Sequence, residues 1–266
     1  MPSPVPPAQS GPLAGRAVLV TGGLGGIGRE IAAAAFDRGA MVYVSRRPDA
    51  GAHRNAKRAV SAPRASLEAS VRHVELDVTC EADWSRAVDS IVAECGGLYG
   101  LVNNAGLLEP AIEFTALTLA HWRRHMAVNL DGCFMGCRLA MRAMDGGGAI
   151  VNVSSGAAYL TVPDAAAYCT SKAAVLALTR LAAKAGAARN VRVNAVLPGA
   201  IDTPMLWRNL TDGAPAEFLE HLTRLHPIGR IGTPGDVAAA VAFLLDPGND
   251  FVTGALLAVD GGQLVG

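Results

Sequence analysis

Short apolar runs alternate with helix-like segments along almost the whole chain, and this alternation restricts the possible folds more than any other feature. The expected strands cover residues 16–21, 41–45, 71–76, 98–103, 147–155, 190–197 and 255–260. Strands that are apolar throughout and separated by helices are typical of a parallel sheet covered on both faces. We therefore predict an α/β fold with one doubly wound parallel sheet of about seven strands, in a single domain over residues 12–266.

Three segments depart from this alternation. Residues 1–11 are rich in proline and are expected to form a disordered tail. Residues 48–70 contain basic side chains and Pro63, which predict a solvated crossover with a partial helix. Residues 204–232 mix large apolar and polar side chains, and two interpretations stay open: a mobile flap over an apolar ligand, or an ordinary amphipathic surface helix.

The composition excludes some classes of partner. The 266 residues include 23 basic and 23 acidic side chains, so the net charge is zero, whereas nucleic acids and anionic membranes attract basic surfaces. The longest apolar run, residues 237–245, is too short to span a bilayer. Five scattered cysteines without paired spacings, and an N-terminal segment without an apolar core, indicate a reduced cytoplasmic protein.

The most glycine-rich stretch, TGGLGGIG (21–28), lies between the first expected strand and the first expected helix. A phosphate loop of the GxxxxGK[ST] type is excluded, because Arg29 and Glu30 stand where lysine and a hydroxyl residue are required. Two dinucleotide-binding patterns remain, GxGxxG and TGxxxGxG, and the stretch alone does not separate them. In both patterns, glycine lets the backbone approach a pyrophosphate at the N-terminus of a helix.

A second group of residues suggests acid–base chemistry. Tyr168 and Lys172 are four residues apart in a segment expected to be helical, so their side chains share one face. A nearby ammonium group favours the phenolate and should lower the pKa of the tyrosine, which makes it a usable acid or base for a carbonyl–alcohol pair. Ser155, at the end of an expected strand, could hydrogen-bond a substrate oxygen on which charge develops.

In combination and in order, the motifs resemble the short-chain dehydrogenase/reductase family, in its compact single-domain branch. The resemblance extends from about Leu13 to Gly262. It rests on TGGLGGIG, LDVT (76–79), NNAG (103–106), VNL (128–130), NVSS (152–155), YCTSK (168–172), PGAIDTP (198–204) and VDGG (259–262). It implies a Rossmann-type fold and an oxidoreductase that transfers a hydride between a nicotinamide cofactor and a ketone or secondary alcohol.

The resemblance implies a catalytic set and a cofactor site. Tyr168 would be the acid–base group, and Asn129 would hold a water that relays protons to the lysine. The full catalytic set would be Asn129, Ser155, Tyr168 and Lys172. The cofactor would contact Gly22, Gly26, Ile27, Gly28, Asp77, Val78, Asn103, Ala105, Gly106, Tyr168, Lys172, Pro198, Gly199, Ile201 and Thr203.

The resemblance also selects one glycine register. In the family the pattern is TGxxxGxG, which places the required glycines at Gly22, Gly26 and Gly28. Gly23 and Gly25 would then be fillers, and Gly23→Ala is expected to be tolerated.

Residues at the end of the second expected strand bear on the choice of cofactor. Relatives that prefer NAD carry an acid there, whereas this chain has Arg46 followed by Arg47. An arginine pair suits the 2′-phosphate of NADP through charge-assisted hydrogen bonds. We expect NADP(H), with NAD(H) as the alternative. A sensory protein that binds NADP without performing chemistry is the alternative from another functional class.

The residues expected to line the substrate pocket are mostly apolar, which suggests a small-molecule substrate with a hydrophobic body. They are Leu107, Ala157, Tyr159, Val162, Met205, Leu206 and Trp207. The resemblance further implies a homotetramer, built partly on helices near 112–145 and 166–188.

Two other spacings carry less information. His121 and His125 are four residues apart, but two arginines lie between them where a zinc-protease helix has a glutamate next to the first histidine, so no metal site is expected. Cys133 and Cys137 have the same spacing and are expected to be small core residues of the helix that carries Asn129.

Overall fold

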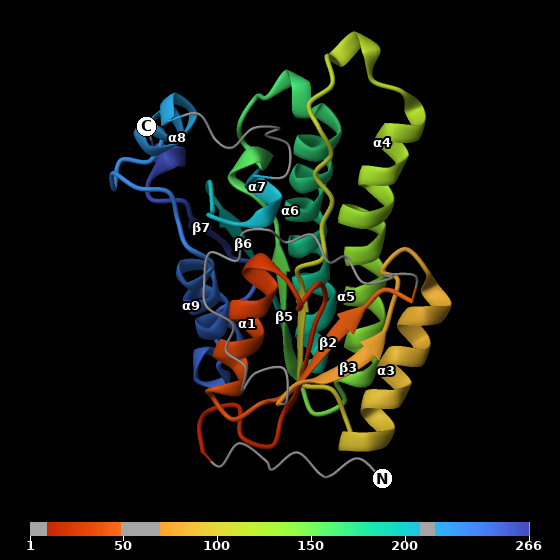
Figure 1. The fold of residues 1–266 in the computed structure, drawn as a ribbon. Coiled ribbons are helices and arrows are strands. Elements are labelled where there is room, and N and C mark those ends of the chain that lie inside the picture. Colours follow the sequence, from red (N-terminus) through yellow and green to blue (C-terminus); the bar gives the residue numbers. More distant parts are fainter. Residues whose placement is uncertain (1–9, 49–69, 208–215, 266) are drawn as a thin grey trace.

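The computed structural model describes residues 10–48, 70–207 and 216–265, and its strands form one sheet (Figure 1). The strands are β1 (Ala17–Val20), β2 (Met41–Arg46), β3 (Arg72–Glu75), β4 (Gly100–Asn103), β5 (Gly148–Val153), β6 (Val191–Pro198) and β7 (Leu256–Val259). Their order is β3-β2-β1-β4-β5-β6-β7, and every neighbouring pair is parallel. The predicted Rossmann-type α/β fold is therefore confirmed.

Helices connect the strands. The longer ones are α1 (Gly26–Phe36), α3 (Glu81–Cys95), α4 (Leu119–Met126), α5 (Gly132–Ala143), α6 (Ala166–Gly186), α7 (Pro204–Trp207), α8 (Ala216–Arg224) and α9 (Pro234–Leu245). A π-turn, η2 (Ala127–Asp131), joins α4 to α5 without a break. The short 3₁₀ turns are η1 (Phe114–Ala116), η3 (Gly156–Ala158), η4 (Pro163–Ala165), η5 (Ala187–Arg189), η6 (Pro247–Asn249) and η7 (Gln263–Val265).

Two layers of helices cover the sheet, because both of its faces are apolar. Alternate residues of a strand point to opposite faces, so Val18 and Leu19 of β1 belong to different hydrophobic clusters. α1 and α9 lie side by side on the face of Val18 (Figure 1). α3, α5 and α6 cover the face of Leu19, where the largest fully buried side chain is Trp84. Cys133 and Cys137 are buried in this second cluster, as predicted.

The segments expected to be irregular lie partly outside the described residues. Residues 1–9 and 49–69, which hold the predicted tail and most of the predicted crossover, are outside them. Gly11 is described, and a Cβ at this position would lie 2.3 Å from the carbonyl oxygen of Arg38. Gly11 therefore packs against the turn that follows α1, although it belongs to the predicted tail. In the predicted flap, 204–232, α7 and α8 flank residues 208–215, which are not described.

Among the helices of the described ranges, none has both the length and the hydropathy that a bilayer crossing requires.

Candidate active site

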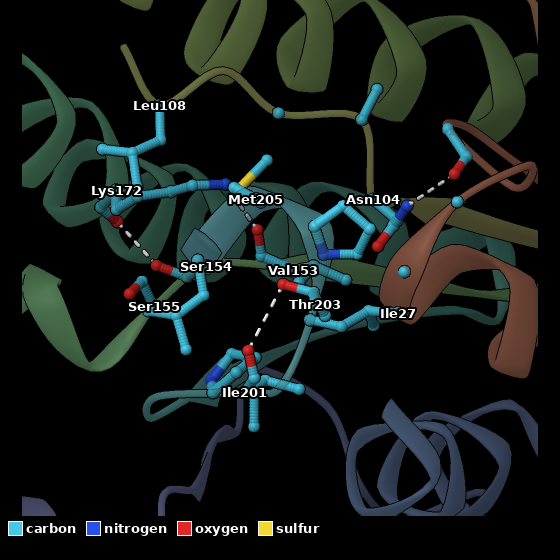
Figure 2. A pocket seen from close by; sticks show the side chains of 18 of the residues that line it. Ile27, Asn104, Leu108, Val153, Ser154, Ser155, Lys172, Ile201, Thr203 and Met205 are labelled. Atoms are coloured by element: carbon cyan, nitrogen blue, oxygen red, sulfur yellow. Dashed lines mark hydrogen bonds between the residues drawn. The ribbon is translucent and has the colours of Figure 1, made fainter. Parts of the chain in front are cut away.

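A cavity of about 390 Å³ lies at the carboxyl ends of β1, β4, β5 and β6 (Figure 2). β1 continues into α1 on one face of the sheet, whereas the chain after β4 leads to α4 and α5 towards the other face. A crevice forms where neighbouring strands send their connections to opposite faces, and ligands of open α/β sheets bind in such crevices.

The glycine loop (residues 21–28) forms one wall of the cavity. Gly22 and Gly26 have φ angles of 64° and 45°, in the left-handed region that favours glycine. A Cβ at Gly28 would lie 2.3 Å from the carbonyl oxygen of Gly22 and 2.5 Å from Nδ2 of Asn104. These three glycines carry the predicted TGxxxGxG register, and each is required by the backbone around it.

The other two glycines differ, and the expectation for Gly23 is wrong. A Cβ at Gly23 would lie 2.6 Å from Cγ1 of Val44 on the neighbouring β2, whereas no atom lies within 4 Å of a Cβ at Gly25. Gly23 is thus needed for packing against the sheet, and Gly25 alone behaves as a filler. The contact partner lies 21 residues away in the sequence, so the glycine pattern itself gives no sign of it.

The N-terminus of α1 faces the cavity next to this loop. The first hydrogen bond of the helix runs from the N–H of Arg29 to the carbonyl oxygen of Gly25, at 3.3 Å. The N–H groups of Gly26, Ile27 and Gly28 therefore precede the helical ladder, and the first two of these residues line the cavity. Such a helix end, beside a loop without side chains, fits the pyrophosphate of a dinucleotide.

Asn104, which was not predicted, fastens the glycine loop to the post-β4 strip (residues 104–109). Its Nδ2 donates to the carbonyl oxygen of Thr21 at 2.9 Å. The same Nδ2 donates to the carbonyl oxygen of Gly22 at 3.2 Å (Figure 2). In return, Oγ1 of Thr21 accepts the N–H groups of Asn104 and Ala105, both at 3.0 Å. Asn104 is the second residue of NNAG, and its place between two predicted contacts could have indicated it.

The post-β6 loop (residues 198–203) forms the opposite wall. Pro198, Gly199, Ile201 and Thr203 line the cavity, together with Ala105 and Gly106 of the post-β4 strip. Cγ2 of Thr203 would lie 3.3 Å from a Cβ at Gly26, so this loop closes against the glycine loop. The structure thus brings most of the predicted cofactor residues together.

Ser155, Tyr168 and Lys172 line the same cavity. Tyr168 and Lys172 lie one turn apart on α6, as predicted. Nζ of Lys172 donates to the carbonyl oxygen of Val153 at 2.9 Å and lies 5.8 Å from the ring centroid of Tyr168. Ser155 follows β5 and accepts the N–H of Ala157 at 3.2 Å. A serine hydroxyl, a phenol and an ammonium group around one cavity can bind a carbonyl oxygen and exchange a proton with it.

The pKa of Tyr168 is shifted opposite to the direction expected from the sequence. Burial raises the pKa of this phenol, and a hydrogen bond with Ser155 opposes the rise without cancelling it. Burial also lowers the pKa of Lys172 from 10.5 to about 8, because this residue is only 5% exposed. The spacing correctly predicts that the two side chains share one face of the helix. It contains no information about desolvation, which is the largest cause of both pKa shifts.

Asn129 lies in the π-turn η2 and is used for hydrogen bonds to the post-β4 strip. Its Oδ1 accepts the N–H of Leu107 at 2.7 Å, and its Nδ2 donates to the carbonyl oxygen of Leu107 at 3.0 Å and to Oγ of Ser171 at 2.9 Å. It does not line the main cavity. With Val78, Asn103 and Lys172 it borders a smaller interior pocket.

The apolar wall of the cavity is formed by Leu108, Met205 and Leu206. Met205 and Leu206 were predicted. Leu107 was predicted as well, but the next residue, Leu108, lines the cavity in its place. Asn129 binds both backbone groups of Leu107, and the following side chain, Leu108, is the one at the cavity.

Four further predicted pocket residues do not line the cavity: Ala157, Tyr159, Val162 and Trp207. Tyr159 and Val162 are 58% and 42% exposed, because they follow η3 away from the sheet. Nε1 of Trp207 donates to Oδ1 of Asp202 at 2.5 Å. These residues are close to the motifs in the sequence, which predicts that they lie near the site. The sequence does not predict the direction in which their side chains point.

Some predicted cofactor residues also lie outside the cavity lining. Arg46 and Arg47 are exposed at the end of β2. The preceding Ser45 accepts the N–H of Gly22 at 3.0 Å, which holds this strand end beside the glycine loop. Asp77 and Val78 follow β3, and Val78 borders the smaller pocket. Asn103 is buried and bonded to Asn152 of β5 at 2.9 Å.

Glu109 joins His121 and His125 in a cluster that the sequence did not reveal. One ligand atom from each lies within 4.8 Å of the others. Arg124 donates to both oxygens of Glu109, at 3.2 and 2.9 Å, and is the main reason that the pKa of this carboxyl is lowered. Nε2 of His125 accepts the N–H of Glu109 at 3.4 Å, and its Nδ1 lies 3.1 Å from the carbonyl oxygen of His121. Each group thus has a protein partner, and the cluster fastens the post-β4 strip to α4.

The chain is similar to known proteins over nearly its whole length. Residues 22–263 match the family model described as enoyl-(acyl carrier protein) reductase. The cis-4-hydroxycyclohexanecarboxylate dehydrogenase of Sinomonas cyclohexanicum is 40% identical over 251 residues, which are 93% of this chain and 96% of that protein. The 3-alpha-(or 20-beta)-hydroxysteroid dehydrogenase of Mycobacterium tuberculosis is 36% identical over 261 residues, 97% of this chain and 93% of that protein.

A solved structure agrees with these matches. ElxO with NADP bound has a TM-score of 0.83 at 31% identity and covers 94% of this chain and 99% of its own. The chain belongs to the short-chain dehydrogenase/reductase family. The family resemblance predicted from the motifs is confirmed. As a short-chain dehydrogenase/reductase, the protein is an NAD(P)-dependent dehydrogenase of alcohols and ketones.

The glycine register can be tested by adding single methyl groups. Gly28→Ala should weaken NADPH binding by about tenfold or more, because its Cβ must displace a backbone oxygen of the loop. Gly25→Ala should bind NADPH like the unaltered protein, and Gly23→Ala should lower the melting temperature, because Val44 must move. Titration of NADPH fluorescence and thermal unfolding measure the two effects. Equal binding by the Gly25 and Gly28 variants would contradict the register.

Buried Lys172 predicts a pH dependence of stability. Its pKa is about 8 in the folded protein and 10.5 ordinarily, so the unfolded chain binds more protons between these pH values and the free energy of unfolding rises with pH across them. The rise should be on the order of 3 kcal/mol. Urea denaturation should show that Lys172→Met abolishes it, whereas Lys184→Met, on the exposed side of the same helix, should retain it. A rise that persists in Lys172→Met would exclude this lysine as its source.

Proposed function

We propose that this short-chain dehydrogenase/reductase uses NADP(H) to interconvert a secondary alcohol and a ketone on an alicyclic ring. The proposal rests chiefly on Ser155, Tyr168 and Lys172, which line one cavity with the glycine loop. The apolar wall beside them, with Leu108 and Met205, suits a substrate whose body is hydrophobic.

Each of the three polar side chains has a distinct part in this reaction. When bound, NADP(H) supplies or accepts the hydride. Ser155 donates a hydrogen bond to the substrate oxygen, on which negative charge develops during reduction. Tyr168 gives its proton to that oxygen, and takes it back in the reverse direction. Burial raises the pKa of Tyr168, so the phenol holds its proton at neutral pH, and Lys172 stabilises the phenolate left after transfer.

Asn129 takes a supporting part. It shares the small interior pocket with Lys172, and Oδ1 of Asn129 and Nζ of Lys172 would both lie 3.5 Å from a Cβ at Gly106. A water held between the amide and the ammonium group would relay protons between the lysine and solvent. Through its two bonds to Leu107, the same amide keeps the post-β4 strip in place.

NADP(H) is favoured over NAD(H) by the residues beside the glycine loop. Arg46 and Arg47 follow Ser45, whose hydroxyl accepts the N–H of Gly22. The backbone therefore holds both arginines beside the glycine loop, where we expect the adenosine part of the cofactor to bind. Exposed arginines there can bind a 2′-phosphate with paired hydrogen bonds. ElxO, a structural relative at 31% identity, has NADP bound.

The named relatives support the substrate class. One is a dehydrogenase of a hydroxycyclohexanecarboxylate and another of hydroxysteroids. Both names describe a hydroxyl group carried by a compound with alicyclic rings, and the cyclohexane hydroxyl and the 3-alpha-hydroxyl are secondary alcohols on a ring. Leu108, Met205 and Leu206 line the same cavity as Ser155 and Tyr168 and offer such a ring an apolar surface.

We also propose a cytoplasmic homotetramer that is formed by one compact domain over residues 12–266. Phe134 of α5 and Leu181 of α6 are 47% and 71% exposed, and both lie on helices that the family resemblance predicts at subunit contacts. The five cysteines are free, which suits a reducing compartment. The alternative of a sensor without chemistry does not agree with the enzyme class of the relatives, and a sensor has no need of a phenol and an ammonium group beside the glycine loop.

Tyr168→Phe tests the reaction. Loss of the phenolic proton should lower kcat for cyclohexanol or hydroxysteroid oxidation by about 10²–10⁴-fold while leaving NADPH affinity unchanged. Tyr159→Phe is the matched control, because that tyrosine lies nearby in the sequence but points to solvent. Absorbance of the reduced cofactor and a fluorescence titration measure the two quantities. Retained turnover in Tyr168→Phe would disprove the role of this residue, and no turnover of any alicyclic alcohol by the unaltered protein would disprove the substrate class.

Arg46→Asp tests the cofactor. The unaltered protein should have a lower KM for NADP than for NAD, and the carboxylate should reverse this order by repelling the 2′-phosphate and binding the ribose of NAD. The change in NADP affinity should be about tenfold or more. Arg123→Asp on α4 makes the same change of charge at an exposed position and should leave the order intact. A lower KM for NAD in the unaltered protein would overturn the NADP assignment.

A further inference from the structure

A buried histidine lies directly behind the post-β6 loop, on the side away from the cavity. His226 follows α8 and is only 2% exposed. It does not line the main cavity, but with Ala200 and Ile201 it borders a second cavity of about 360 Å³ behind the loop. The loop is therefore a thin wall, with the candidate active site on one side and His226 on the other.

Both ring nitrogens of His226 are used, and their partners fix its chemical form. Nε2 lies 3.0 Å from the backbone N of Ala200, whose N–H can only donate. Nδ1 lies 2.6 Å from the carbonyl oxygen of Leu222, which can only accept. The ring is therefore neutral, with its hydrogen on Nδ1 and a lone pair on Nε2. One imidazole thus connects the last turn of α8 to the post-β6 loop.

Three other polar backbone groups of this part of the loop are held by backbone groups, and the carbonyl oxygen of Ile201 accepts the hydroxyl of Thr203 at 3.3 Å. The N–H of Gly199 donates to Val259 of β7 at 3.1 Å, and the carbonyl oxygen of Ala200 accepts the N–H of Gly232 at 2.8 Å. The N–H of Asp202 donates to the carbonyl oxygen of Gly232 at 2.9 Å. Among the described residues, His226 is the one side chain that accepts an N–H of residues 199–202.

The ring also explains why residue 199 is glycine. A Cβ there would lie 2.6 Å from Nε2 of His226 and 3.0 Å from Cα of Asp260. The imidazole and the backbone of Gly199 therefore pack in direct contact, and the loop has little freedom to move towards the histidine. Packing and hydrogen bonding together fix the position of residues 199–201.

We propose that His226 is a positioning residue for the nicotinamide end of the cofactor. It holds Gly199, Ala200 and Ile201 against the cavity, and it makes the position of this loop depend on α8, which belongs to the segment interpreted as either a substrate flap or an amphipathic surface helix. The inference rests on the proposed function only in taking NADP(H) as the cofactor. His226 touches neither cofactor nor substrate, so it acts through the loop alone.

Three variants separate this role from general stability. His226→Phe keeps a ring of similar shape but removes the acceptor, which leaves the N–H of Ala200 unpaired or forces the loop to shift. His226→Gln keeps an acceptor that can reach Ala200. His221→Gln is the matched control, since His221 lies on α8, five residues before His226, and is exposed. Each variant is examined as the full chain by thermal unfolding, NADPH titration and amide hydrogen exchange.

The expected result is specific to the loop. His226→Phe should raise the Kd for NADPH by about tenfold and speed hydrogen exchange in the peptide containing residues 199–202, measured without cofactor. His226→Gln and His221→Gln should stay close to the unaltered protein in both measurements. If His226→Phe does not fold, the same comparison is made with His226→Asn, whose shorter amide does not reach Ala200.

Two outcomes would overturn the inference. Unchanged exchange of residues 199–202 in His226→Phe would show that the histidine does not hold the loop, whatever the cofactor. Equal weakening of NADPH binding by His226→Phe and His226→Gln would show that the acceptor is irrelevant. Failure of the unaltered protein to bind NADPH is a different result: it overturns the proposed cofactor, and the positioning role for NADP(H) with it.

Discussion

The hydrogen bonds between Thr21 and Asn104 determine where a ligand can enter this molecule. Thr21 follows β1 and Asn104 follows β4, the two adjacent strands whose connections leave for opposite faces of the sheet. Four hydrogen bonds join these strand ends: two to Oγ1 of Thr21 and two from Nδ2 of Asn104. They keep the strand ends together while the chains diverge beyond them. Beyond these hydrogen bonds the glycine loop and the post-β4 strip lie apart, and part of the cavity lies between them.

The strands and the glycine register were predictable because their causes are local in the sequence. An apolar run buried on both faces identifies a strand regardless of its neighbours. Each observed strand overlaps its predicted range, and β2 and β6 extend beyond their predicted ranges by one residue each. Gly22 and Gly26 are required by their own φ angles. Gly23 is required by Val44, a residue of the adjacent strand. Contacts between strands follow from sheet order, which no pattern within eight residues contains, and this is why the expectation for Gly23 failed.

The candidate site was predictable in its members but not in their orientation or environment. The motif order identified Ser155, Tyr168 and Lys172, which share the cavity. The choice between Leu107 and Leu108 depends on which backbone groups Asn129 binds, and the pKa of Tyr168 depends on how much water reaches the phenol. Both are three-dimensional quantities. His226 stands in no recognised motif, and only the folded chain brings it to Ala200.

The π-turn η2 has a geometric consequence for the whole edge of the site. In a regular α-helix, each step of four residues rotates the side chain by ~40° around the helix axis. Residues at every fourth position therefore soon lose contact with an extended segment that lies along the helix. The wider turn at 127–131 reverses part of this drift. Positions 121, 125, 129, 133 and 137 all contact the single segment 103–109, which runs alongside them in the opposite direction. The single π-turn thus keeps these five positions on one side of the helices. The segment 103–109 therefore has helical residues to contact along its whole length, from the end of β4 to the edge of the cavity.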